Sequence, residues 1–161
     1  MSLQPSESLD ADLMAAFADG CTMLRSAISG LSDEQLDLVP IPGKWSIRQV
    51  VCHLTDFEII SAARIQRIIA EENPTLFDAD PDTFASRLAY GRRDVQDDLA
   101  TIDALRRHML RMIRCCELED FQRTCVHSVD GPMTLEAIVE RTARHIPHHV
   151  RFIEEKIAAM Q

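Results

Sequence analysis

The sequence is poor in the residues that interrupt regular structure, with 5 glycines and 7 prolines among its 161 residues. It also lacks any uncharged apolar run of about 18 residues, the length that a membrane span needs, so we expect no membrane partner. Its first residues, MSLQPSESLDAD, are acidic and contain no basic stretch followed by an apolar one, which argues against a secretory signal. The sequence therefore predicts a cytoplasmic protein.

Positive charge is also scarce, because 17 lysines and arginines stand against 26 acidic residues and leave a formal net charge of -9. An acidic chain repels phosphate backbones on average, so we expect no nucleic-acid partner. The hydrophobic content of 46% excludes a disordered chain. The length and the absence of repeats or low-complexity tracts predict a single domain over residues 1–161.

The cysteines do not form a disulfide framework. Their number is odd, two are adjacent and no Cys-x-x-Cys pair occurs; they are Cys21, Cys52, Cys115, Cys116 and Cys125. We predict buried free thiols, which behave as small core residues. A redox or ligand role for Cys52 is the alternative, but one helical step of about 100° turns it away from its neighbour His53.

Helical rather than alternating periodicity fills most of the chain and predicts an all-α protein. Apolar spacing predicts four long helices, over about residues 8–30, 46–70, 95–116 and 134–160. Capping-box patterns predict that the second begins at Ser46 and that one short turn begins at Ser32. Thr134 is expected to cap the last helix. Four helices with short to moderate connections predict a four-helix bundle.

The connections contain two segments of different character. Residues 73–81 form a connection that contains two prolines. In one interpretation, a further helical segment begins at Asp82 and leads into the third long helix. Residues 121–133, FQRTCVHSVDGPM, have an extended or loop-like pattern that Gly131-Pro132 closes before the last helix.

The last helix carries three of the six histidines. On a helical wheel, His145 and His149 differ by about 40° and lie at the apolar arc, whereas His148 falls on the polar side. Two inward imidazoles one turn apart can bind one metal. Packed core histidines are the alternative, although burying both without a partner is costly.

His53, on the apolar side of the second helix, is the candidate third ligand. Three neutral imidazoles leave a coordination position open, which is typical of a catalytic metal site. A surface or core histidine is the alternative for His53, and Asp56 is either a carboxylate that orients an imidazole or a solvated acid.

Two metal-dependent classes are excluded by missing motifs. No histidine of the helices follows a glutamate at the Glu-x-x-His spacing of ferritin-like di-iron proteins. The HExxH motif of zinc proteases is also absent.

Several other residues have competing interpretations. Arg64, on the His53 side of its helix, is either a clamp for a substrate anion or a surface charge. We expect Trp45 to plug one end of the bundle and residues 87–93 to form a solvated surface of mixed sign rather than an anion site. His108 is expected on the surface, and His127 in a turn near the mouth of the site.

Three segments resemble the DinB/YfiT-like superfamily. Residues 43–58 (GKWSIRQVVCHLTDFE) are similar to its "GKWSxxEVxxHLxDxE" segment, residues 127–136 (HSVDGPMTLE) to its "HPxFGxxTLxE" stretch, and residues 145–149 (HIPHH) to its closing "HxxHH" motif. The segments occur in the family's order, and the resemblance spans residues 43–153.

The resemblance implies a four-helix bundle that forms a homodimer and holds a divalent metal, Zn or Ni, with His53, His145 and His149. Some members are transferases or isomerases that use low-molecular-weight thiols such as bacillithiol, mycothiol or glutathione, and others are called metal-dependent hydrolases. We therefore expect a metal-dependent enzyme that acts on a small-molecule substrate, as a thiol S-transferase or as a hydrolase. The alternative is a non-catalytic dimeric scaffold or small-ligand sensor with a structural or vacant metal site.

Three residues depart from the family pattern. Ile146 stands where an acidic residue usually follows the first histidine of the closing motif, and Phe152 stands where a glutamine is usual. Pro147 lies between the two presumed ligands, and because proline kinks helices we expect it to tilt His149 relative to His145. These departures leave the prediction of a metal site in place but weaken the prediction of the substrate.

Overall fold

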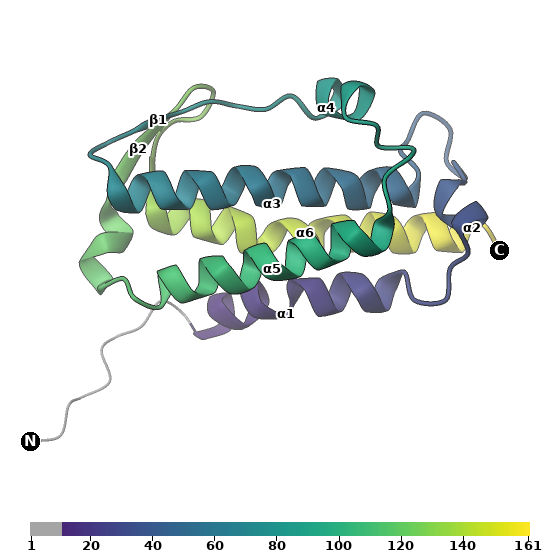
Figure 1. The fold of residues 1–161 in the computed structure, drawn as a ribbon, viewed down its shortest axis with the longest axis horizontal. Helices are drawn as coiled ribbons and strands as arrows, with labels where there is room; N and C mark the ends of the chain where they lie inside the picture. The colour runs from purple at the N-terminus through teal and green to yellow at the C-terminus, as the bar shows by residue number, and fades with distance from the viewer. Residues whose placement is uncertain (1–10) are drawn as a thin grey trace, which may run out of the picture.

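The computed structural model describes residues 11–161, in which four long helices lie side by side along the long axis of the molecule (Figure 1). They are α1 (Ala11–Ala27), α3 (Ile47–Ala70), α5 (Val95–Ile113) and α6 (Leu135–Ala159). Helix α1 packs against α5 and α6, and α3 packs against the same two helices. The predicted all-α four-helix bundle is confirmed; the predicted start of the first helix, before residue 11, lies outside the described residues.

Shorter elements connect the long helices. They are α2 (Asp33–Asp37), β1 (Thr75–Leu76), α4 (Pro81–Arg87), the 3-10 helix η1 (Leu118–Gln122), β2 (Thr124–His127) and β3 (Gly131–Thr134). Strand β2 pairs antiparallel with β3 and parallel with β1, which makes a small three-stranded sheet. The extended segment was therefore predicted, whereas β1 was not, because its two residues give no alternating pattern.

Side-chain caps set where the long helices begin. The Gln49 amide donates to Ser46 Oγ over 3.2 Å, and the Ser46 amide donates to Gln49 Oε1 over 2.9 Å, so the predicted capping box is present. Thr134 caps α6 through the Ala137 amide at 3.2 Å. These caps fix the register of the two helices that carry the candidate histidines.

Helix α6 continues through Pro147 without a break. Proline removes one backbone donor in a helix interior, but the turns on both sides remain helical from Leu135 to Ala159. The apolar residues of α6 that face the bundle are buried on both sides of the proline, among them Ala143, Ile146 and Val150. Packing against the other helices therefore holds this helix together.

A buried ion pair joins all four long helices at the centre of the bundle. Arg106 of α5, 2% exposed, donates to Glu58 of α3 through Nε at 3.0 Å and Nη2 at 2.6 Å. It also donates to the carbonyl oxygens of Phe17 on α1 at 2.9 Å and Thr142 on α6 at 2.7 Å. Burial raises the pKa of the Glu58 carboxyl, and the adjacent guanidinium counteracts that rise.

Gly20 gives the guanidinium its space. A Cβ atom at this position would lie 2.7 Å from Arg106 Nη1 and 3.4 Å from Ile146 Cδ1. Because hydrogen bonds to three other helices hold the guanidinium in place, it has little freedom to move away. A residue larger than glycine in α1 would force this helix away from the ion pair.

We expect Arg106→Met and Glu58→Leu each to lower the free energy of unfolding by about 3–5 kcal/mol, because each leaves one buried charge unpaired. The double variant should lose less than the sum of the two single losses, since no buried charge remains. Urea denaturation followed by circular dichroism measures all three. The control Arg107→Met changes the exposed neighbouring arginine and should stay within about 0.5 kcal/mol of the wild type. Equal losses of stability in Arg106→Met and Arg107→Met would contradict the structural role of the buried ion pair.

Candidate functional site

Three histidines from two helices converge at one point of the bundle. His53 Nε2 of α3 lies 3.3 Å from His145 Nε2 of α6, and His149 Nε2 lies 3.2 Å from the same atom. One ligand atom from each of the three lies within 4.8 Å of the others. All three side chains are half-buried, whereas His148 is exposed, beside Arg151 at 3.1 Å. The structure thus brings together the three residues that the sequence pattern selected.

The helical geometry explains the convergence. His145 and His149 are one turn apart, so their side chains are neighbours on the face of α6 that packs against α3. The centroids of the His145 and His149 rings are 4.6 Å apart, so Pro147 does not separate the two rings. His53 enters from α3, with its ring 5.1 Å from that of His145 and 4.8 Å from that of His149.

The spacing of the three nitrogens fits a shared metal ion. Two nitrogens that bind one tetrahedral ion at about 2.0–2.1 Å lie about 3.3–3.4 Å apart. The two observed separations, 3.3 Å and 3.2 Å, are close to this value. Imidazole is a ligand that Zn, Ni and Cu accept, so the donor set also fits a divalent ion of this kind.

The three imidazoles are held in the neutral form that binds metals. Burial lowers the pKa of His145 to about 2, and the neighbouring rings of His149 and His53 add to this decrease. The pKa of His149 falls to about 3, first by burial and then by the adjacent His53. Burial also lowers the pKa of His53, against the opposing influence of Asp56. At neutral pH, each ring therefore offers a lone pair.

Aromatic rings surround the cluster. Phe57 stacks on His145, with centroids 3.6 Å apart and planes 25° apart, and Trp45 lies 5.2 Å from His53. Trp45, which was predicted to plug one end of the bundle, also forms a wall of the site. The second ring nitrogen of His145, Nδ1, is buried and has no hydrogen-bond partner among residues 11–161. In most metal-binding histidines, the nitrogen that does not bind the metal donates a hydrogen bond, so His145 differs from them in this respect.

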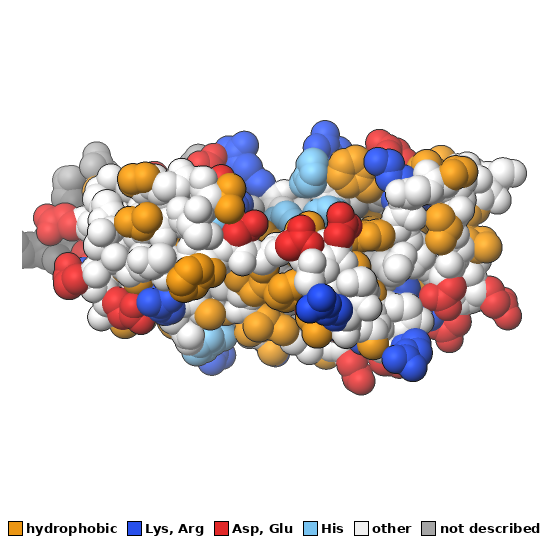
Figure 2. Space-filling view, turned by 90° about the horizontal axis from the view of Figure 1, so that it is seen from above, with side chains coloured by type: hydrophobic (Ala, Val, Ile, Leu, Met, Phe, Trp, Pro, Cys, Tyr) orange, Lys and Arg blue, Asp and Glu red, His pale blue; other side chains and the backbone are white. Residues whose placement is uncertain are grey.

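Two cavities adjoin the cluster, one at His149 and one at His53. A cleft of about 460 Å³ reaches His149 and is bordered by Trp45, which precedes α3, and by Phe152 of α6. A smaller pocket of about 90 Å³ reaches His53. Figure 2 shows histidine side chains in a hollow on this face of the molecule, with charged side chains around it. A small molecule can therefore approach the three nitrogens.

A largely buried lysine also borders the larger cleft. Lys156 of α6 borders the cleft and is 4% exposed. Burial lowers the pKa of Lys156, and nearby Lys44 contributes to this decrease, against the opposing influence of Glu155. The sequence pattern did not indicate Lys156, because it falls in a charged stretch that is typical of a solvated helix end.

Charged residues behind His53 correct two predictions. Asp56 is buried and pairs with Arg93 at 2.8 Å, so it is not the solvated acid that was one of its interpretations, and no hydrogen bond joins it to an imidazole among the described residues. Arg93 also pairs with the buried Asp98 of α5. The prediction of a solvated surface over residues 87–93 is wrong at Arg93 and at Tyr90, which is 1% exposed. No local pattern reveals these contacts between distant segments.

Two further predictions change with the fold. Arg64 is 7% exposed and borders the smaller pocket, so the surface interpretation is wrong. His127, expected in a turn, is instead the last residue of β2, directly before the turn, and is 2% exposed. Its Nδ1 accepts from the amides of Val129 at 3.4 Å and Asp130 at 3.2 Å. His108 is exposed, as predicted, beside Gln66 at 3.2 Å.

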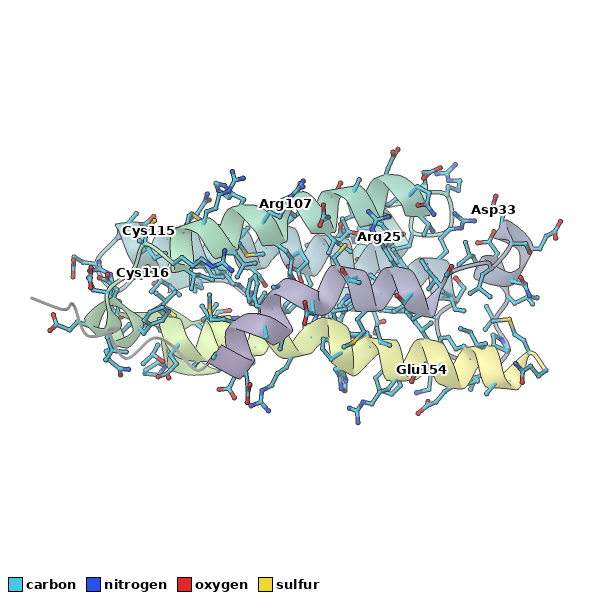
Figure 3. All side chains as sticks on the ribbon, turned by 90° about the horizontal axis from the view of Figure 1, so that it is seen from below. Arg25, Asp33, Arg107, Cys115, Cys116 and Glu154 are labelled. Atoms are coloured by element: carbon cyan, nitrogen blue, oxygen red, sulfur yellow. The ribbon has the colours of Figure 1, made fainter. Side chains whose placement is uncertain are left out.

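The cysteines are free thiols, as predicted, but burial was wrongly predicted for Cys115, which is exposed, and for Cys116, which is half-buried. Both follow the end of α5, as Figure 3 shows, and neither borders the histidine cluster. Cys52 is buried and donates to the Tyr90 carbonyl over 3.2 Å, and burial raises its pKa to about 12, which removes it from redox or ligand chemistry near neutral pH. No cysteine therefore borders either of the two cavities at the histidines.

Comparisons with known proteins agree on one family. The model of the DinB superfamily matches residues 16–153. A protein of Oceanobacillus iheyensis named "Putative metal-dependent hydrolase" is 29% identical over 131 residues, which cover 81% of this chain and 76% of that protein. A protein of Bacillus cereus with the same description is 32% identical over 130 residues, 81% of this chain and 75% of its own.

A solved structure has the same fold. YfiT from Bacillus subtilis, described as "a probable metal-dependent hydrolase with an unusual four-helix bundle topology", superposes with a TM-score of 0.87 at 25% sequence identity. The match covers 99% of this chain and 94% of YfiT. Among residues 11–161 of the present chain, no helix has the length and apolarity needed to cross a membrane.

We expect the metal-free protein to lose stability as the pH falls from 7 to 5. The folded protein keeps His145 and His149 neutral, whereas the unfolded chain protonates them near pH 6.5, so the unfolded state binds more protons in this window. Each such histidine contributes a slope of at most about 1.4 kcal/mol per pH unit. Urea denaturation at several pH values after chelation measures the slope. It should be smaller in His145→Gln and unchanged in the control His108→Gln; an unchanged slope in His145→Gln would contradict the buried neutral ring.

Proposed function

Since this chain belongs to the DinB superfamily, we propose that it is a metal-dependent enzyme in which His53, His145 and His149 hold a divalent ion, Zn or Ni. The observation that carries the proposal is the convergence of three neutral imidazole nitrogens at separations of 3.2 and 3.3 Å. The names of the relatives support a metal-dependent hydrolase. The adjoining cleft supports a small-molecule substrate.

A bound divalent ion with three protein ligands lowers the pKa of a water or thiol in its open position and so supplies a nucleophile near neutral pH. The three histidines contribute lone pairs without bringing charge of their own, because burial keeps them unprotonated. Phe57 and Trp45 contact the rings of His145 and His53 and restrict their orientation. Lys156 places its amine beside the cleft, where it can orient an anionic or polarised part of the substrate.

Two reaction types suit this arrangement. In the hydrolase version, water attacks a carbonyl or similar centre of a substrate in the cleft of about 460 Å³, and the alcohol or amine of the cleaved bond leaves with a proton. In the transferase version, the sulfur of a low-molecular-weight thiol bonds to the electrophilic carbon of a small molecule in the same cleft, and the leaving group of that molecule departs with the thiol proton. The names of the relatives favour the hydrolase reaction. The thiol transferase reaction is supported by the sequence resemblance, because some members of the family use low-molecular-weight thiols. The homodimer that the resemblance implies stays a prediction.

We expect the purified protein to carry near-stoichiometric Zn or Ni, measured by elemental mass spectrometry. His53→Ala, His145→Ala and His149→Ala should each lose tight metal binding, because two imidazoles do not complete a three-ligand site. His148→Ala is the matched control: it removes an exposed imidazole of the same helix and should keep the wild-type metal content. Equal metal content in all four variants, or a wild type that takes up neither added Zn nor Ni, would refute the proposal.

Turnover separates the enzyme from a metal-stabilised scaffold. A panel of small esters, amides and lactones, and of electrophiles with glutathione or bacillithiol, should contain a substrate that is consumed by the metal-loaded protein. Chelation should stop the reaction, and added Zn or Ni should restore it in the wild type and in His148→Ala but not in His53→Ala. If metal removal lowers the melting temperature and no member of the panel is turned over, the non-catalytic scaffold or sensor is the better interpretation.

A further inference from the structure

Arg64 is a buried cation without an ion-pair partner. It is 7% exposed, its Nη2 donates to the Phe77 carbonyl over 2.6 Å, and its Nε has no acceptor among residues 11–161. Among the ion pairs of these residues, none contains Arg64. Burying a charge without a partner is costly. A ligand that supplies the missing acceptor would offset this cost.

The other buried arginines are fully engaged. Arg106 pairs with Glu58 at 2.6 Å, and Arg48 pairs with Asp33 at 2.8 Å and Asp37 at 2.6 Å. Structural arginines in this fold are thus matched by carboxylates of the chain itself. Arg64 is the exception in the part of the chain that the structure describes.

Arg64 also borders the pocket that reaches the histidine cluster. His53, Phe57, Ile60 and Arg64 follow one another at helical spacings of four, three and four, so they form one stripe along α3, and all four border the pocket of about 90 Å³. The segment that connects β1 to α5, with α4 in its middle, runs alongside α3 in Figure 1 and supplies the opposite wall through Phe84. The pocket therefore has a histidine end, an apolar middle and a guanidinium end.

Asp78 and Asp130 stabilise the charge of Arg64 from a distance, but neither forms an ion pair with it. Asp56 pairs with Arg93 at 2.8 Å, and Asp130 pairs with Arg141 at 2.8 Å. Asp78 is half exposed, and its Oδ1 lies 3.9 Å from His127 Nε2. The guanidinium is the group at this end of the pocket that still needs an acceptor.

We propose, on the premise that the three histidines form the metal site, that Arg64 binds a carboxylate of the substrate or of a thiol co-substrate. A guanidinium presents a planar fork of donors that matches the two oxygens of a carboxylate. The eleven helical steps from His53 to Arg64 span about 16 Å along the helix axis, and both side chains border the same pocket. The site thus selects a small acid with an apolar segment between its reacting atom and its carboxylate.

Hexanoate can serve as a probe of this pocket, and 1-hexanol is the control, because it has the same chain length but no carboxylate. We expect the Nε–H resonance of Arg64 in 15N NMR spectra of the full-length protein to shift with hexanoate until it saturates, and not to shift with 1-hexanol. Arg64→Gln should weaken hexanoate binding about 10- to 100-fold, the range of a hydrogen bond to a charged group. Arg67→Gln is the matched control, because Arg67 lies on the same helix but pairs with Glu71 on the surface.

The outcomes separate this proposal from the metal proposal. If hexanoate does not move the Arg64 resonance, or 1-hexanol binds as tightly as hexanoate, the carboxylate site is wrong even when the metal content is normal. If hexanoate binds at Arg64 and the wild type takes up no metal, the carboxylate site stands and the proposed enzyme fails. These wild-type comparisons hold even if Arg64→Gln unfolds, and Arg64→Lys, with its charge kept and its planar fork lost, should bind with intermediate affinity.

Glutathione identifies the source of the carboxylate. Competition of glutathione with hexanoate at the Arg64 resonance would assign the site to the thiol co-substrate. Hexanoate binding that excess glutathione does not displace would assign it to the other substrate. Both results support the site, since each requires a carboxylate at Arg64.

Discussion

The guanidinium of Arg106 is the group on which the packing of this bundle depends. It extends from α5 and binds Glu58 of α3 and backbone carbonyls of α1 and α6, so one side chain connects the four long helices. Two of these contacts lie next to the candidate site. Glu58 stands five residues after His53, and Thr142 stands three residues before His145. The ion pair therefore sets α3 against α6 about one turn from the point where the three imidazoles meet.

The same burial that holds the helices together prepares the histidines. Inside the bundle a protonated ring loses its hydration, and three adjacent rings repel one another's charge, so the neutral forms are favoured and the pKa of His145 falls to about 2. The nitrogens then face one another at 3.2 and 3.3 Å, with one cleft and one pocket beside them. The arrangement of ligands without charge and with open access is typical of a catalytic rather than a structural metal site.

The cationic side chains discussed above fall into two groups, those that pair with a carboxylate of the chain and those that do not. Arg48, Arg93 and Arg106 are matched by carboxylates of the same chain and hold elements together. Arg64 and Lys156 are also buried, but neither has a carboxylate among the ion pairs of the described residues, and each borders one of the two cavities at the histidines. The arginines that hold elements together are thus paired within the chain, whereas Arg64 and Lys156, each beside a cavity, form no ion pair among residues 11–161.

The sequence by itself determined the helices, their caps and the inward direction of three histidines, because helical periodicity and capping depend on residues close together in the chain. It placed His145 and His149 inward and His148 outward, and His53 was selected from its apolar neighbours. Only the tertiary structure decided which charges meet: the partners of Arg106 and Arg93, the burial of Arg64 and the contact of Trp45 with His53 depend on how the elements pack. Packing brings together segments that are separated in the chain, and local spacing carries no information about such contacts.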